Sequence, residues 1–504
     1  MKVISADAMR EVDKKTIASG ISGDTLMERA GKAAAHEIIK FLETLHPNHT
    51  HRLVIVCGKG NNAGDGLVIA RLLQESYHIQ IVALFPLETL KGDALVNFKR
   101  LDDNIEISDH LELQRGDVII DCLLGTGLNS KIREPLSSAV RQINESNLPV
   151  ISIDISSGLN GNTGEVMGDA VHADLTICIG QPKMGQFHQS GPKYSGQLRC
   201  ADIGFPQAYI DEIENFEEAI FEVDVAKFFK RRSSSSHKYE CGSVVVVGGS
   251  PSYMGAAFLS GRAALRSGAG IVRVAIPIQK KQIVARQMDA LIIDSFKSSD
   301  GYWSKKHYKD LSKLIKEKTV LAVGPGFAGV DSEKELLDDI INYQGPMVID
   351  AGAIGLLNEE HLKLRKRQNV TVLSPHCGEM KSLVKNLKNC PDGSVEEQAA
   401  WISSEFQVFL ILKGQYSQIF CPDGEMYRNT SGSVALATAG AGDVLTGLIA
   451  SYLSQLEKSK EAVLAAVFVH GRAGEMSLQG KRGLIADDLI GLIPQALMEI
   501  TAWA

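Results

Sequence analysis

A single aspartate, Asp443, stands where a glycine-rich run meets an apolar one. It closes the stretch 438–443, TAGAGD, and is followed by residues 444–450, VLTGLIA. Small residues let consecutive backbone N–H groups point toward one spot, and the start of a helix adds positive potential there, which favours an anion such as phosphate. A carboxylate beside that anion could accept the proton of a hydroxyl group that is being phosphorylated. The other interpretation is an ordinary glycine-rich loop with Asp443 capping a core helix.

Several other loops of small or polar residues follow predicted strands in the second half of the chain. They are residues 248–256, 324–326, 350–353, 374–379 and 413–417. In sheets of parallel strands, ligands bind outside the carboxyl ends of the strands, so we expect these loops to gather around Asp443. His376 could bind a ligand there or be a loop histidine bonded to backbone, and Lys413 could contact a phosphate or simply close its strand.

Three loops in the first half of the chain form a second candidate site. Residues 58–66, GKGNNAGDG, residues 121–131, DCLLGTGLNSK, and residues 154–159, DISSGL, each follow a predicted strand. Their spacing matches neither the dinucleotide fingerprint Gly-x-Gly-x-x-Gly nor a Walker loop. Many backbone donors at strand ends are nevertheless typical of phosphate or dinucleotide binding.

Two aspartates and a set of oxygen-bearing side chains give these three loops their chemistry. Asp121 and Asp154 could move protons, or each could be a strand-end residue that bonds to nearby N–H groups. The oxygens of Asn62, Asp121 and Ser157 could hold a hard cation. Because only one of them is a carboxylate, a monovalent ion fits more easily than a divalent one.

Short β-branched runs alternate with longer helical patterns, which predicts two successive α/β domains. The runs are residues 53–57, 80–84, 117–121 and 150–154, followed by 243–247, 272–276, 320–323, 347–350, 370–373 and 408–412. Continuous apolar runs of this length are typical of parallel strands covered on both faces. A charged segment that ends in four serines predicts a flexible linker with the boundary near residue 225. We expect domains at 1–215 and 237–504, joined by a linker at 216–236.

The composition of the chain excludes several classes of protein. The 504 residues carry a formal charge of −7, with 44% hydrophobic and 22% charged residues, so neither nucleic acid nor a membrane surface is an expected partner. The eight cysteines include no Cys-x-x-Cys pair, no apolar run reaches membrane-spanning length, and the N-terminus has no leader pattern. We expect a cytoplasmic protein with reduced thiols.

Residues 1 to about 215 resemble the epimerase module of the NAD(P)HX repair proteins. The resemblance is carried by residues 61–66, 121–131 and 154–158. It implies a Rossmann-like three-layer domain that equilibrates the two C6 epimers of hydrated NADH or NADPH, called NADHX and NADPHX, with K⁺ as a structural ion. The implied K⁺ ligands are Asn62, Asp121 and Ser157. The implied substrate-binding residues are Asn61, Asn62, Ala63, Gly64, Asp65, Gly125, Thr126, Gly127, Leu128, Asn129, Ser130, Lys131 and Asp154.

Epimerisation of a carbon that bears a hydroxyl group and a ring nitrogen can proceed by loss and return of the hydroxyl through an iminium-like species. A carboxylate at this carbon can move the proton and stabilise the cation. Asp121 and Asp154 are both candidates for this catalytic role. We prefer Asp154, because Asp121 could be occupied by the ion.

Residues from about 235 to 504 resemble the ribokinase-like dehydratase module of the same proteins, in the order of the bifunctional bacterial form. The resemblance implies that the C6 hydroxyl of the (S) epimer is phosphorylated by ADP and that phosphate is then eliminated, which gives NAD(P)H, AMP and phosphate. ATP stays open as the donor. Mg²⁺ is expected with the nucleotide, and a homo-oligomer is expected from the family. The implied residues are Ala256, Gly326, His376 and the catalytic Asp443 for the hydrate, and Lys413, Gly414, Gln415, Tyr416, Ser417 and Gly442 for the nucleotide.

Some residues depart from the family pattern, and two other functions stay open. Residues 350–355 read DAGAIG where the family usually has DADALN, so Gly352 and Gly355 could weaken nucleotide or metal binding. One alternative is a small-molecule kinase of the ribokinase superfamily, since the Gly-Ala-Gly-Asp motif serves that chemistry equally well. The other is a non-catalytic dinucleotide-binding scaffold.

Overall fold

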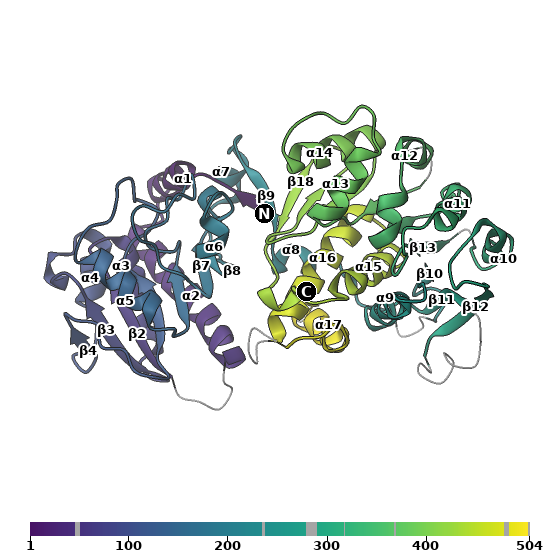
Figure 1. Ribbon diagram of the computed structural model, residues 1–504. Helices are drawn as coiled ribbons and strands as arrows, with labels where there is room; N and C mark the ends of the chain where they lie inside the picture. The colour runs from purple at the N-terminus through teal and green to yellow at the C-terminus, as the bar shows by residue number, and fades with distance from the viewer. Residues whose placement is uncertain are drawn as a thin grey trace. The chain divides into compact units, whose positions relative to one another are not determined.

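The chain folds into two α/β units, seen here in a computed structural model. The structure describes residues 1–45, 51–233, 237–278, 290–316, 318–366, 369–477 and 483–501. The two compact units are Met1–Ala219 and Ile220–Ala504, and their elements are labelled in Figure 1. None of the helices in these described ranges is long and apolar enough to cross a membrane.

The first unit is built on a parallel seven-stranded sheet with the strand order β4-β3-β2-β5-β6-β7-β8. The strands are β2 Arg52–Cys57, β3 His78–Ala83, β4 Glu106–Ser108, β5 Val118–Cys122, β6 Val150–Ile153, β7 Leu175–Ile179 and β8 Gln197–Ala201. The helices are α1 Ala6–Ala18, α2 Gly23–Leu45, α3 Asn61–Leu73, α4 Gly92–Phe98, α5 Leu136–Glu145, α6 Gly191–Ser195 and α7 Gln207–Asp211. The order changes direction between β2 and β5, so the loops that leave these two strands open onto a shared crevice.

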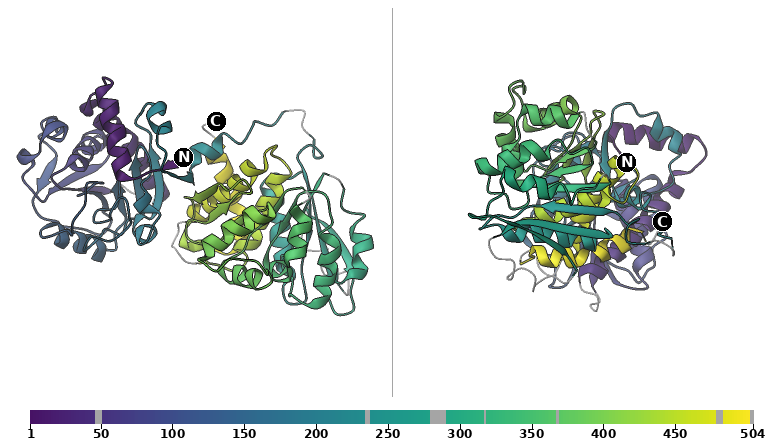
Figure 2. Two further views of the ribbon diagram at one scale, coloured as in Figure 1. Left: turned by 90° about the horizontal axis from the view of Figure 1, so that it is seen from above. Right: turned by 90° about the vertical axis from the view of Figure 1, so that its right-hand side faces the viewer.

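The second unit has a larger sheet with the order β18-β17-β16-β15-β14-β13-β10-β11-β12. The parallel strands are β10 Ser243–Val247, β11 Ile271–Ile278, β12 Ile292–Lys297, β13 Thr319–Val323, β14 Met347–Ile349, β15 Thr371–Leu373 and β16 Phe409–Leu412, and the antiparallel ones are β17 Gln418–Phe420 and β18 Met426–Asn429. The direction changes between β10 and β13. Figure 2 shows the unit from two further directions.

Helices cover both faces of the second sheet. They are α9 Met254–Arg266, α10 Tyr308–Leu311, α11 Asp331–Ile340, α12 Glu359–Lys366, α13 Cys377–Lys385, α14 Val395–Phe406, α15 Ala441–Leu453, α16 Ser459–Met476 and α17 Ala486–Thr501. The valine run of β10 shows why: Val244 and Val246 belong to the core beneath α9 and α15–α17, whereas Val245 and Val247 belong to the core beneath α11–α14. Successive side chains of a strand point to opposite faces, so a continuous apolar run fills two cores.

The segment expected as a linker differs from that expectation in its first half. It contains β9, Glu217–Ile220, which pairs antiparallel with β1, Lys2–Val3. It also contains α8, Glu222–Ala226, whose Val225 lies with Ile220 in the core of the second unit. The few apolar residues that lie between the charged residues of this segment are enough to pack α8 and the end of β9 against that core. Residues 234–236 of the expected linker lie outside the described residues.

Candidate active sites

The three loops of the first unit meet at Asn62, Gly125 and Asp154. Asn62 lies in the first turn of α3 and donates from Nδ2 to the carbonyl oxygen of Leu124 over 3.0 Å. A Cβ placed on Gly125 would lie 3.5 Å from both Asn62 Cβ and Asp154 Oδ2. The absence of a side chain at Gly125 therefore keeps the space in front of Asp154 open.

Asp121, at the end of β5, is completely buried and accepts four hydrogen bonds. Oδ1 accepts from Ser157 Oγ at 2.6 Å and from the Leu123 amide at 3.2 Å. Oδ2 accepts from Ser152 Oγ at 2.8 Å and from the Ser157 amide at 3.0 Å. Burial raises the pKa of Asp121, and these hydrogen bonds oppose the rise. Asp121 thus ties β5, β6 and the following loop together.

A group of oxygen atoms beside Leu124 has the chemistry of a monovalent cation site. Asn62 Oδ1 is buried and has no hydrogen-bond partner. Ser157 Oγ, which also accepts from the Leu124 amide at 2.9 Å, and the Leu124 carbonyl lie close by. Within the described ranges, no three His, Cys, Asp or Glu side chains are grouped so as to hold a metal ion. Neutral oxygens next to one carboxylate suit K⁺ better than a divalent ion.

Asp154 follows β6 in the left-handed backbone region, with φ +70°, and pairs with a buried lysine. The Lys183 ammonium binds Asp154 Oδ1 and also donates to the Ile179 carbonyl at 2.9 Å. Gln186 donates from Nε2 to the Asp154 carbonyl at 3.1 Å and accepts from the Lys183 amide at 2.8 Å. Burial, the largest single influence, lowers the pKa of Lys183, but the charge and hydrogen bond of Asp154 together with Cys178 and Cys200 outweigh it, and the pKa rises.

Two further carboxyl groups lie close enough to this pair to interact with it electrostatically. Burial raises the pKa of Asp13, on α1, to about 6; Lys183 opposes the rise and Asp154 adds to it. Burial, with Asp154 and Asp13, raises the pKa of Asp65, on α3, well above its usual value. Both acids are therefore easier to protonate than exposed aspartates.

The other residues predicted for this site lie on the same two segments. Ala63 and Gly64 are buried in the first turn of α3. Thr126 and Leu128 are half-buried in the irregular loop after β5, and the exposed residues are Asn61, Gly127, Asn129, Ser130 and Lys131. Sequence reasoning missed Asp13, Lys183 and Gln186, which belong to none of the glycine-rich motifs.

Asp443 lies in the first turn of α15, which begins at Ala441. Gly440, the residue before the helix, has a left-handed backbone with φ +87°. Burial raises the pKa of Asp443 to about 7; Asp350 adds to the rise, Lys413 opposes it and Glu379 adds to it. The Asp443 carbonyl accepts a hydrogen bond of 2.7 Å from Ser260 on α9.

Lys413 connects four elements of the second site. Its Nζ lies 2.9 Å from Asp350 Oδ1 and 3.5 Å from Glu379 Oε2. A Cβ placed on Gly442 would lie 3.4 Å from the same nitrogen. The second oxygen of Asp350 accepts from Thr446 Oγ1 of α15 at 2.6 Å. Lys413, Gly442 and Asp443 are thus brought together as predicted, while Asp350, Glu379 and Thr446 were not among the predicted site residues.

His376 caps helix α13. Its Nδ1 accepts from the amides of Gly378 at 2.9 Å and Glu379 at 3.2 Å, and its own amide donates to Glu379 Oε2 at 2.9 Å. The backbone-bonded interpretation of this histidine is therefore present in the structure. The ring stays largely exposed, which leaves its predicted contact with substrate open.

The loops after β10 and β13 pack closely against each other. The Gly249 amide donates to the Pro325 carbonyl at 2.8 Å. Gly326 has φ +79°, and a Cβ there would lie 2.2 Å from the Tyr253 carbonyl oxygen. Ala256 is half-buried near the start of α9. In the turn after β16, the Gly414 amide donates to Ser417 Oγ at 3.3 Å, with Gln415 and Tyr416 between them.

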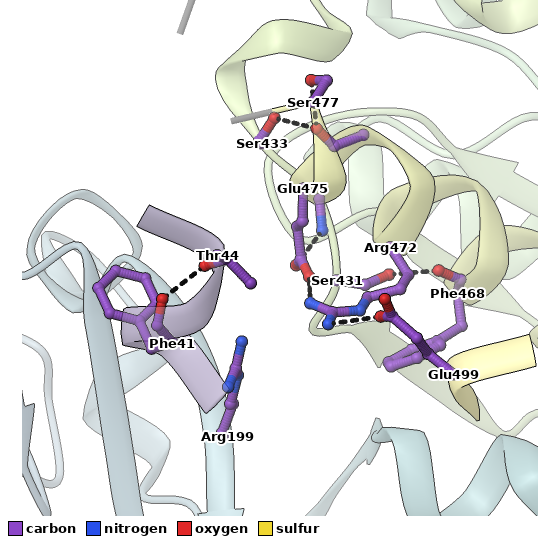
Figure 3. Close-up of polar contacts among 12 residues, drawn as sticks. Phe41, Thr44, Arg199, Ser431, Ser433, Phe468, Arg472, Glu475, Ser477 and Glu499 are labelled. Carbon is purple, nitrogen blue, oxygen red and sulfur yellow. Dashed lines mark hydrogen bonds and ion pairs between the residues drawn. The ribbon is translucent and has the colours of Figure 1, made fainter. Parts of the chain in front are cut away.

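Helix α16 forms hydrogen bonds with the segment that leads into the glycine-rich loop before Asp443 (Figure 3). Ser431 Oγ donates to the Phe468 carbonyl at 2.8 Å, and the Gly432 amide donates to Glu475 Oε1 at 2.8 Å. Arg472 binds the other oxygen of Glu475 at 2.9 Å. Phe468, Arg472 and Glu475 lie on α16, far from the motif in the sequence, and no pattern around the motif marks them.

His470, also on α16, forms a hydrogen bond with the end of the glycine-rich loop, where α15 begins. It is buried, and its Nε2–H donates to the Ala441 carbonyl at 2.9 Å. Burial is the main reason why its pKa falls to about 4; the Ala441 hydrogen bond opposes this fall and Lys413 adds to it. The histidine is neutral at physiological pH, so it orients the loop without adding charge.

Comparison with known proteins matches each unit separately and the chain as a whole. A family model described as NAD(P)H-hydrate dehydratase matches residues 244–495, and one described as the YjeF-related protein N-terminus matches residues 23–185. The bifunctional NAD(P)H-hydrate repair enzyme Nnr of Moorella thermoacetica is 33% identical over 523 aligned residues, which cover 99% of this chain and 97% of the relative. Its counterpart in Coxiella burnetii is 31% identical over 487 residues, which cover 95% of this chain and 96% of that relative.

A solved structure also matches part of this chain. The ADP/ATP-dependent NAD(P)H-hydrate dehydratase of Bacillus subtilis, co-crystallised with ATP and Mg²⁺, is 27% identical with a TM-score of 0.48. The match covers 56% of this chain and 99% of that one.

Proposed function

The chain belongs to the family of bifunctional NAD(P)H-hydrate repair enzymes, and from this premise we propose how its two sites divide the repair. The first unit interconverts the (R) and (S) epimers of NADHX and NADPHX. The second unit dehydrates the (S) epimer to NADH or NADPH with an adenine nucleotide as phosphoryl donor. Family membership over the whole length favours this function over the small-molecule kinase and the binding scaffold.

In the first unit, Asp154 is the residue that moves the proton. The ring-nitrogen lone pair expels the C6 hydroxyl, which leaves as water after taking a proton, and water returns to the other face of the iminium-like ring and gives the proton back. Asp154 Oδ2 borders the open space at Gly125, so it can relay this proton and stabilise the cation. The four hydrogen bonds of Asp121 suit a structural role instead.

K⁺ would be held by Asn62 Oδ1 and Ser157 Oγ, with Asp121 supplying the compensating charge. The unpaired buried oxygen of Asn62 supports this assignment. A bound K⁺ supplies positive charge that fixes the three loops. Thermal unfolding in K⁺ and in choline buffers tests it: K⁺ should raise the unfolding midpoint of the native protein but not that of Asn62→Ala. An equal effect on both proteins would contradict the site.

In the second unit, Asp443 accepts the proton of the C6 hydroxyl as it attacks the nucleotide. The observation that carries this assignment is the raised pKa of Asp443, about 7, next to the Lys413 ammonium and the glycine-rich loop. The backbone N–H groups of residues 440–443 and the Lys413 charge can neutralise the moving phosphoryl group. Mg²⁺ supplies charge to the nucleotide phosphates when bound. The ring nitrogen then expels phosphate, a much better leaving group than hydroxide, and loss of a proton from C5 of the resulting iminium-like ring to water gives NAD(P)H.

Separate assays of the two epimers test this division. The (R) epimer without nucleotide should give the (S) epimer, detected by chromatography, and the (S) epimer with ADP and Mg²⁺ should give NADH. Asp154→Asn should lose only the first reaction and Asp443→Asn only the second. Loss of both reactions in one folded variant would contradict two separate sites.

Three assignments remain: the phosphoryl donor, the assembly state and the cellular location. We propose ADP as the donor, a homo-oligomeric assembly and a cytoplasmic location; all eight cysteines are free, as in a reducing compartment. Comparison of kcat/KM with ADP and ATP tests the donor, and light scattering tests the assembly. A clear preference for ATP, or a monomer at cellular concentrations, would contradict these assignments.

A further inference from the structure

Lys183 is a buried charge that the assigned chemistry does not use. Its side chain is 1% exposed, and lysine is almost never so deeply buried without a partner. The ammonium contacts Asp154 Oδ1 and the carbonyl oxygen of Ile179. Gln186 binds the backbone of both Lys183 and Asp154, so the pair is held from two sides.

The two oxygens of Asp154 have different surroundings. Oδ1 is bound by Lys183 and also accepts from the Ile179 amide at 3.4 Å. Oδ2 lies 3.5 Å from the place that a Cβ on Gly125 would fill. The left-handed backbone of Asp154 is sparsely populated for residues other than glycine, and the contacts of Lys183 and Gln186 stabilise it.

We propose that Lys183 is a positioning residue of the epimerase: its ammonium holds one oxygen of Asp154 so that the other faces the C6 hydroxyl of the substrate. This inference rests on the proposed role of the first unit. Held in this way, Asp154 can give a proton to the leaving hydroxyl and take one back from the returning water through the same oxygen.

Other titratable groups surround the pair and bear on its pH dependence. They are Asp13 on α1, Asp65 on α3, Cys178 on β7 and Cys200 on β8. When they are ionised, the two carboxyls repel the charge of Asp154, and the ammonium offsets them. Removal of the ammonium leaves Asp154 without the positive charge that offsets them.

The test uses the full-length Lys183→Met variant, with Lys183→Arg beside it and the exposed Lys193→Met as a matched control. We expect kcat of epimerisation to fall about 100-fold in Lys183→Met, within the range for a mispositioned acid–base group, with KM changed little. The acid limb of its pH–rate profile should move to higher pH. Lys183→Arg should restore part of kcat and return the limb toward its native position, and dehydration by the second unit should be unchanged in all variants.

Two results would overturn the proposal. One is a folded Lys183→Met protein with native kcat and pH profile. The other is a loss of activity in which the acid limb does not move and the arginine variant, shown to be folded by its circular dichroism, restores nothing; Lys183 would then have only a structural role. If the native protein itself does not interconvert the epimers, the proposed function fails and not this inference alone.

Discussion

At the scale of the residue, each site places one lysine beside carboxyl groups, but in different surroundings. Lys183 is buried and contacts Asp154 directly, whereas Lys413 is shared between Asp350 and Glu379 and interacts with Asp443 electrostatically. At Asp154 the direct ion pair holds the carboxyl group in one orientation. The arrangement at Asp443 leaves a group that can gain and lose a proton near neutral pH, as a general base requires.

The pH dependence of dehydration should report Asp443. Because its pKa is raised to about 7, kcat/KM should fall as pH drops through that value and the base becomes protonated. Glu379→Gln removes a negative charge that raises this pKa, so its profile should move to lower pH. The exposed Glu396→Gln, with the same change of charge, should leave the profile in place. A profile that is flat across neutral pH would contradict Asp443 as the base.

Asp121 and Asp154 should respond differently to the same substitution. In Asp121→Asn the new amide group faces hydrogen-bond donors, and each donor left unsatisfied costs about 1–3 kcal/mol of unfolding free energy. Urea unfolding should show this loss, while the folded fraction keeps most of its epimerase kcat. Asp154→Asn should lose about 100-fold or more in kcat even where it is fully folded. The reverse pattern would make Asp121 the catalytic group.

Sequence reasoning found the aspartates because glycine-rich motifs surround them. It missed Lys183 because its partner is 29 positions away and the residues around it match no motif. His470 was missed for the same reason: an apolar helix predicts a buried position but not the carbonyl group that the position faces. Pairing between distant segments is set by tertiary packing, which local pattern cannot supply.

At the scale of the element, the first site forms where the strand order changes direction between β2 and β5, and the second forms at the carboxyl ends of β14, β15 and β16, beside the start of α15. The alternation of apolar runs predicted β2, β3, β5 and β6 and most parallel strands of the second sheet. It missed β1, β4, β7, β8 and β12, and the antiparallel pair β17–β18. β12 is largely solvent-facing along its edge, and β8 mixes polar with apolar residues, so neither has a continuous apolar run. The charged composition of 216–236 likewise concealed β9 and α8.

Gly326 should be intolerant of even a methyl group. Its left-handed backbone costs a non-glycine residue about 1–2 kcal/mol, and the new Cβ would collide with the Tyr253 carbonyl. Gly326→Ala should lower the unfolding free energy of the second unit and raise KM for the hydrate. Gly491→Ala, in the exposed interior of α17 with nothing near its Cβ, should stabilise instead by about 0.5–1 kcal/mol. Equal effects of the two substitutions would contradict the close packing of the loops after β10 and β13.

At the scale of the whole molecule, each site is complete within one unit. The residues around Asp154 all lie within Met1–Ala219, and those around Asp443 all lie within Ile220–Ala504. Length and the restarting strand pattern were enough to predict two α/β domains. The repeated strand pattern does not indicate which reaction each domain catalyses, however. That depends on the side chains at the carboxyl ends of the strands in each unit.

Two inactive variants should therefore complement each other when mixed. Asp154→Asn alone should convert only the (S) part of an epimer mixture, and Asp443→Asn alone should form no NADH. Together they should convert the whole mixture, because the first site of one chain feeds the second site of the other through solution. A mixture that stops at the (S) fraction, with both proteins folded, would mean that the two sites must share a chain.

The most direct test of the account is recovery of NADH from both epimers by the native protein. Purified full-length enzyme is given a mixture of (R)- and (S)-NADHX with Mg²⁺ and K⁺, and NADH absorbance is followed with ADP, with ATP and with no nucleotide, against a blank for spontaneous epimerisation. We expect complete recovery that depends on nucleotide. Recovery that stops at the (S) fraction would mean that the first unit is silent, and no recovery with either nucleotide would contradict the assignment of both sites.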